Sequence, residues 1–209
     1  MKVEGDLSAS PEGYGSRLRT FRALRYRDFR LLWTGLSISA IGTWMQIVAL
    51  SLLVLDLTRG SAAALGMVSL TQALTFLVFA AIAGSVADRF DKRRLLMVTQ
   101  SLMIALAVLL GILTMAGLIR FWMILVIAFA NSSLLSFDQP ARNALITSLV
   151  PKEHLVNAVS LQSVVFNGAS ILGPALAGLS LSRIGYAGNF FLNAASFLAV
   201  LIALLLLRK

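Results

Sequence analysis

Cysteine is absent from the 209 residues, and histidine occurs only once, as His154. The lack of cysteine excludes a disulfide framework and any metal site built from thiolates. His154 follows Glu153 but has no aspartate–serine constellation beside it. A surface position is therefore a better interpretation than a catalytic one, because acid–base catalysis needs positioned partners. We expect no catalytic residue, no metal site, no cofactor and no enzymatic activity.

Charged residues are also scarce. They make up 13% of the chain, against 58% hydrophobic residues and a mean hydropathy of +0.87. A soluble domain of this size needs more polar covering, and a helix needs roughly 20 apolar residues to cross a membrane. Barrel strands, which alternate polar and apolar residues over about 10 positions, do not fit such long apolar runs. We predict an all-α integral membrane protein with six transmembrane helices, at about 31–55, 62–87, 95–117, 121–137, 156–181 and 188–207.

The positive charges are distributed by loop. The chain has 18 lysines and arginines, and only three of them, Arg59, Arg120 and Arg183, fall in loops on the side opposite the N-terminus. Cytoplasmic loops hold the lysine and arginine excess in membrane proteins, so both termini are expected to be cytoplasmic. A surface that binds nucleic acid would not sort its charge by alternate loops, so no nucleic-acid partner is expected.

The sequence divides into three regions. Residues 1–16 are polar and rich in glycine, serine and proline, which predicts a disordered cytoplasmic tail. Residues 17–30 carry six arginines among apolar residues and predict a basic helix lying on the anionic inner leaflet. Residues 31–207 form the six-helix bundle. Between its fourth and fifth helices, we expect Asp138 to cap a short cytoplasmic surface helix that begins through Pro140.

One loop, "GSVADRFDKRR" at 84–94, concentrates charge between two apolar segments. Gly84 would allow close approach of another helix, and Asp88, one turn later, could accept hydrogen bonds from a neighbouring helix N-terminus. The arginines that follow could pair with acidic residues across a gate or with lipid phosphates. The alternative is that they only satisfy the positive-inside bias.

At this loop the sequence resembles the major facilitator superfamily. The family's motif between helices two and three is matched by Gly84, Asp88, Arg89, Arg93 and Arg94, and Asp91 stands in place of its second glycine. The resemblance implies that these residues form a gating motif, which closes the cytoplasmic side by docking on an opposite six-helix half. The chain would then be the N-terminal half of a major facilitator fold.

A second motif, "NGASILGPALAG" at 167–178, is similar to the family's antiporter motif. Gly168, Gly173, Pro174 and Gly178 match it, and the resemblance favours an exporter. Here Pro174 removes a backbone donor, while Gly173 and Gly178 would permit tight helix packing. The stretches "DQPARNALITSLVPKEHL" and "GNFFLNAASFLAV" resemble the enterobactin-exporter-like branch, which includes macrolide efflux proteins.

No ionisable residue lies inside the predicted membrane spans, although such residues are the usual marks of proton relays. In the fourth helix the neutral "ANSS" at 130–133 replaces the family's basic motif, so its proton-coupling role does not transfer. The substrate-cavity candidates are amides, namely Gln46, Gln72, Asn131 and Asn167. The alternative, that these amides form hydrogen bonds between helices, stands equally open.

The resemblance implies a secondary active exporter of a hydrophobic or amphipathic small molecule, such as a siderophore or drug. It would work by alternating access and proton-coupled antiport in a prokaryotic cytoplasmic (inner) membrane. Its expected partners are the solute, the lipid bilayer and a second six-helix half, in the same longer chain or in a parallel homodimer. The runner-up is a non-transporting half-transporter or assembly subunit. A membrane-embedded enzyme comes third, since no nucleophile–base pair lies in the spans.

Overall fold

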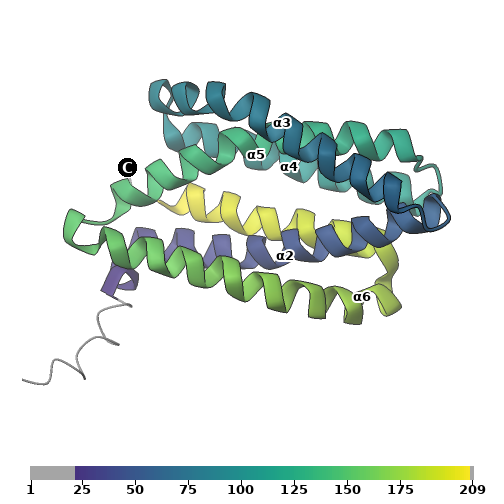
Figure 1. Ribbon diagram of the computed structural model, residues 1–209. Coiled ribbons are helices and arrows are strands. Elements are labelled where there is room, and N and C mark those ends of the chain that lie inside the picture. Colours follow the sequence, from purple (N-terminus) through teal and green to yellow (C-terminus); the bar gives the residue numbers. More distant parts are fainter. Residues whose placement is uncertain (1–21, 208–209) are drawn as a thin grey trace, which may run out of the picture.

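The computed structural model describes residues 22–207, and every regular element in that range is helical (Figure 1). The predicted tail at 1–16 and the start of the predicted interfacial helix lie outside the described residues. Five of the helices are long and apolar enough to cross a membrane. The prediction of an all-α membrane protein is therefore confirmed. The elements are η1 (Arg22–Arg25), α2 (Arg27–Leu57), α3 (Ala62–Arg89), α4 (Lys92–Met115), α5 (Phe121–Leu149), η2 (Lys152–His154) and α6 (Leu155–Leu206).

Helix α6 is two antiparallel arms joined at Gly185. That residue has φ 66° and ψ −170°, a conformation that glycine adopts without the steric cost of a Cβ. Asn189 fixes the turn, because its amide donates to the Gly185 oxygen at 2.9 Å and accepts from the Ser180 hydroxyl at 2.8 Å. Residues nine apart lie far apart in a straight helix, so the contact between Ser180 and Asn189 requires the chain to reverse. Figure 1 shows the second arm returning beside α2.

The helices run alternately up and down, and two apolar clusters mark the two ends of the bundle. The first cluster joins the start of α2 (Phe29), the start of α4 (Leu96), the end of α5 (Leu145) and the end of α6 (Leu204). The second joins the opposite ends of the helices, with residues such as Val54, Ala64, Leu110, Ile124 and Phe190. Both termini of the described chain therefore lie at the end that holds the first cluster, which we call the basic end.

The two ends differ in charge as the sequence predicted. Arg59, Arg120 and Arg183 lie at turns or helix ends beside the second cluster, whereas the other described arginines and lysines lie at the basic end. Which end faces the cytoplasm follows from the positive-inside rule, so the orientation stays a prediction.

Close packing of α2 on the second arm of α6 holds the centre of the bundle. A Cβ added to Gly42 would lie 2.2 Å from the Ser196 hydroxyl oxygen, and one added to Gly35 would lie 3.0 Å from the Ala199 carbonyl oxygen. Small residues on both helices therefore let the backbones approach, as expected for helices that associate in lipid. Gly111 on α4 makes room for the ring of Phe191, which an added Cβ would meet at 2.7 Å.

The structure corrects two predicted boundaries. The predicted interfacial helix at 17–30 is, in its described part, the short η1 followed by α2, and Phe29 is 1% exposed in the bundle core. The α2 helix simply begins earlier than the uncharged run does. The predicted surface helix after Asp138 is instead the last part of α5, which continues through Pro140 to Leu149. Asp138 is not a cap, because it lies in the interior of α5. Its side chain is completely buried.

Helix α3 is the least buried of the five. It presents a row of exposed apolar side chains to its surroundings, namely Met67, Leu70, Leu74, Leu77, Val78 and Ile82. An added Cβ at Gly84 would meet nothing within 4 Å in the described chain. The predicted close approach of a helix at Gly84 is therefore not made by the described helices.

Candidate functional site

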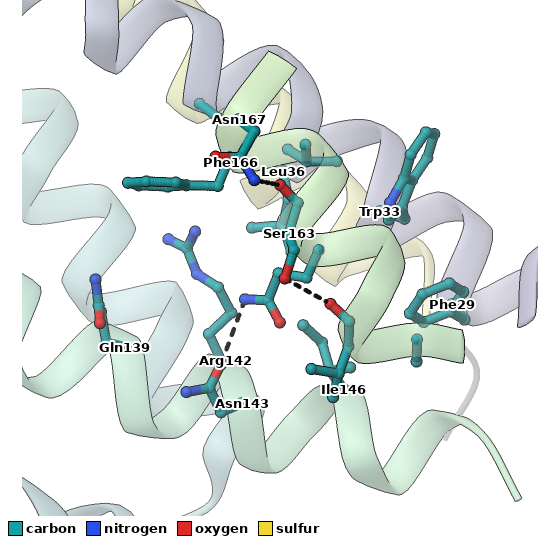
Figure 2. Close-up of a pocket in the computed structure, with 15 residues that line it drawn as sticks. Phe29, Trp33, Leu36, Gln139, Arg142, Asn143, Ile146, Ser163, Phe166 and Asn167 are labelled. Carbon is teal, nitrogen blue, oxygen red and sulfur yellow. Dashed lines mark hydrogen bonds between the residues drawn. The ribbon is translucent and has the colours of Figure 1, made fainter. Parts of the chain in front are cut away.

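A cavity of about 450 Å³ opens between α2, α5 and the first arm of α6, near the basic end (Figure 2). Phe29, Trp33 and Leu36 of α2 form an apolar and aromatic wall, to which Ile146 of α5 and Phe166 of α6 contribute. The polar wall comes from α5 and α6, with Gln139, Arg142, Asn143, Gln162, Ser163 and Asn167. An apolar lining with a few polar groups is typical of small-molecule sites.

Hydrogen bonds within the lining fix part of the polar wall. The Gln162 amide nitrogen donates to the Asn143 side-chain oxygen at 3.3 Å, which links α6 to α5 (Figure 2). The Asn167 amide nitrogen donates to the Ser163 main-chain oxygen at 2.9 Å. Trp33 donates from its indole nitrogen to the Leu161 oxygen at 3.3 Å, which positions its ring at the cavity edge. The lining is thus preorganised by contacts between and within the helices.

Arg142 is the charged residue of the lining, and it pairs with Asp138 one turn earlier in α5. The Asp138 side chain is 0% exposed and the Arg142 side chain 21%. From α4, Thr99 donates its hydroxyl to Asp138 Oδ1 at 3.0 Å and Gln100 donates its amide to the same oxygen at 2.8 Å. A buried carboxylate needs both charge compensation and hydrogen bonds, and this one has both.

The four predicted cavity amides separate in the structure. Asn167 lines the cavity, whereas Gln46 accepts a hydrogen bond of 2.6 Å from Asn193 on the second arm of α6. Gln72 on α3 and Asn131 on α5 are half-buried, and neither belongs to this lining. Gln46 therefore serves as a contact between helices here, and a substrate role for it, Gln72 or Asn131 stays a prediction.

Sequence reasoning missed Asp138 and Arg142 as interior residues. Their charges predict the end of a membrane span, because isolated charges are costly inside one. The available signal was their spacing, since an acidic and a basic residue four positions apart lie on one helix face and can neutralise each other.

The predicted gating motif lies at the basic end, between α3 and α4. Asp91 caps α4 by accepting from the Arg94 main-chain nitrogen at 2.8 Å, with φ −60°, so the turn does not require the motif's glycine. Arg93 donates from Nη2 to the Leu205 oxygen at 3.2 Å and so contacts the C-terminal end of α6. Arg89 ends α3 and is exposed, while Asp88 lies in α3 with its side chain outside the described set. The gating role stays a prediction.

The antiporter-like motif lies in the first arm of α6, and its glycines differ in environment. A Cβ added to Gly173 would lie 2.3 Å from the Trp44 Cβ, so this glycine lets α6 approach α2. Gly168 and Gly178 would meet nothing within 4 Å in the described chain. The predicted tight packing holds for Gly173 but not for Gly178, and α6 continues through Pro174.

His154 has a structural contact. Its ring lies 5.9 Å from that of Tyr26, centroid to centroid, and it is half-buried at the start of α6. Among the described residues there is no group of three or more histidine, cysteine, aspartate or glutamate side chains that could hold a metal ion.

Long apolar helices, with the chain reversing direction between them, define a multi-pass membrane protein. Comparison with protein families adds the class: the model described as transmembrane secretion effector, of the major facilitator type, matches residues 18–209. The chain therefore belongs to the major facilitator superfamily, and within it to this secretion-effector family. These are transporters and not an enzyme class.

Curated relatives include efflux proteins and transporters. The chain is 32% identical to the staphyloferrin A transporter of Staphylococcus aureus over 78% of this chain and 42% of that protein. It is 30% identical to macrolide efflux protein A of Streptococcus pyogenes over 76% of this chain and 40% of that one. It is 27% identical to the multidrug efflux pump Tap of Mycolicibacterium fortuitum over 85% and 44%. The chain thus spans about two fifths of the length of these relatives.

Proposed function

We propose that the protein acts in secondary active export of a hydrophobic or amphipathic small molecule by alternating access, coupled to protons, across a bacterial inner membrane. The observation that carries the proposal is the cavity near the basic end, with its aromatic and amide lining. Under the positive-inside rule this end faces the cytoplasm, where an exported solute must enter. Relatives described as transporting a siderophore, a macrolide or several drugs support the solute class.

We infer that transport needs a second six-helix half. The chain covers about two fifths of its relatives, and α3 exposes an apolar row and Gly84 to its surroundings. In transporters with repeated halves, the substrate path lies between the halves. The second candidate function, a non-transporting half that only assembles with another subunit, rests on the same exposed helix.

Accumulation in cells tests the proposal. A bacterium deprived of its own efflux pumps should accumulate less of at least one solute from a labelled panel of macrolides and siderophores when it makes this chain together with a matching second half. The chain alone should leave accumulation unchanged. If both halves insert and associate yet no solute in the panel is exported, the exporter proposal is wrong and the assembly-subunit hypothesis is favoured.

We further propose six membrane crossings with both ends inside. At 1.5 Å per residue, residues 155–184 and 186–206 are each long enough to cross a hydrocarbon core of about 30 Å. The turn at Gly185 would then lie outside the cell.

The absence of cysteine allows a clean test of this topology. Arg183→Cys should react with a membrane-impermeant maleimide in intact cells, and Lys152→Cys should react only after the cells are permeabilised. Both side chains are exposed in the structure, so burial does not explain a difference. Labelling of Lys152→Cys in intact cells, with Arg183→Cys protected, would reverse the orientation.

A further inference from the structure

The charge pair in the cavity wall points to the kind of solute. We propose that Arg142 recognises a carboxylate on an otherwise apolar or aromatic solute, and that Asp138, its partner in α5, competes with that carboxylate for the guanidinium. The inference rests on the proposed export function and adds to it a chemical class and two residue roles.

Arg142 has donors left after it pairs with Asp138. Its Nη2 is used in that pair, and its Nε is buried without a hydrogen-bond partner in the described structure. A guanidinium carries five N–H donors in a planar fork that matches the two oxygens of a carboxylate. Nε itself is not accessible from the cavity, but the Arg142 side chain is 21% exposed, so a solute carboxylate can reach the exposed part of the guanidinium. Figure 2 shows the Arg142 side chain extending into the space between Gln139 and Phe166.

Asp138 is fixed from the side away from the cavity. Thr99 and Gln100 of α4 both donate to its Oδ1, while Oδ2 pairs with Arg142. A carboxylate held by three donors on two helices has little freedom to turn, so its charge stays beside the guanidinium. It also competes for that guanidinium, because a solute carboxylate must share Arg142 with it.

The remaining lining selects the rest of the solute. Apart from Arg142 the residues of the lining are uncharged, and Phe29, Trp33 and Phe166 give it aromatic faces. A cavity of about 450 Å³ accepts a bicyclic aromatic body with room to spare. A solute with an apolar ring system and one carboxylate places each part against a matching surface.

A matched pair of probes tests the assignment: tritiated 1-naphthaleneacetate and 1-naphthaleneacetamide, which share the ring and differ in charge. Binding to the purified protein in lipid nanodiscs is measured by scintillation proximity, with empty nanodiscs subtracted. We expect wild type to prefer the acetate. Asp138→Asn should raise affinity for the acetate about tenfold, because the competing carboxylate is gone, and leave the acetamide nearly unchanged. The charge-free double variant Asp138→Asn/Arg142→Gln should bind the two probes equally.

The direction of the Asp138→Asn effect separates recognition from structure. A merely structural role would weaken both probes together, and that result overturns the inference, as does a double variant that keeps the preference. Arg142→Lys should keep part of the preference, since the charge remains without the fork. Equal binding of both probes by every variant removes the role of Arg142 and leaves the exporter proposal standing. If the protein prefers the acetate over the acetamide but exports no solute, the exporter proposal is wrong and the role of Arg142 stands.

Discussion

Gly173→Leu should abolish the folded bundle, while Gly178→Leu, five residues later in the same arm of α6, should leave it nearly unchanged. An added Cβ at Gly173 would lie 2.3 Å from the Trp44 Cβ and 3.2 Å from the Ile41 oxygen. The obstacle is the backbone and first side-chain carbon of α2, which cannot rotate away. Overpacking typically costs about 1–3 kcal/mol where a core can adjust, and this contact between two helices leaves less room.

Thermal unfolding in detergent, followed by size-exclusion profile and tryptophan fluorescence, measures the difference. Gly178 is the matched control because an added Cβ there would meet nothing within 4 Å in the described chain. Equal midpoints for the two leucine variants would show that α2 and α6 do not pack at Gly173 as described.

Removal of Arg142 alone should destabilise the protein far more than removal of the whole charge pair. In Arg142→Leu the fully buried Asp138 carboxylate loses its cation, and breaking a buried pair from one side costs about 3–5 kcal/mol. In Asp138→Asn/Arg142→Gln no buried charge remains, and the new amide still offers an oxygen to Thr99 and Gln100. The double variant should stay within about 1 kcal/mol of wild type.

Unfolding by sodium dodecyl sulfate in mixed micelles gives the free energy of unfolding of wild type, Arg142→Leu and the double variant. Gln139→Leu, at an exposed neighbour on α5, controls for a general effect of substitution in this helix. If Arg142→Leu and the double variant lose the same stability, the carboxylate is not held as a buried ion, and it cannot compete with a solute carboxylate for Arg142.

Charge predicts the end of a membrane span because an unpaired charge is costly inside one. Asp91 and Arg183 lie at turns, and neither forms a salt bridge in the described part of the chain, so water is the best environment for each charge. Asp138 lies inside α5 despite its charge, because Arg142 neutralises it and α4 supplies two hydrogen-bond donors. Pro140 added to the error, since a proline inside a helix usually marks its end.

The site was harder to predict because a linear pattern gives the depth of a residue but not its neighbours. The sequence predicts a cavity position for both Gln46 and Asn167, yet Gln46 accepts a hydrogen bond from Asn193, which lies 147 positions later in the chain. Only the fold shows that this amide is already paired. Gly173 and Gly178 belong to one motif, and only the path of α2 separates the packed glycine from the open one.

We propose that the cavity between α2, α5 and α6 carries an exported solute. Ser163→Trp should fill this cavity, whereas Ser160→Trp lies one turn away, outside its lining; both serines are exposed and bond only to a carbonyl of their own helix. The measurement is proton-gradient-driven movement of an exported solute in proteoliposomes that hold this chain with its second half. We predict that Ser163→Trp stops transport and Ser160→Trp preserves it. Equal transport by both variants, with both correctly folded, would contradict the claim.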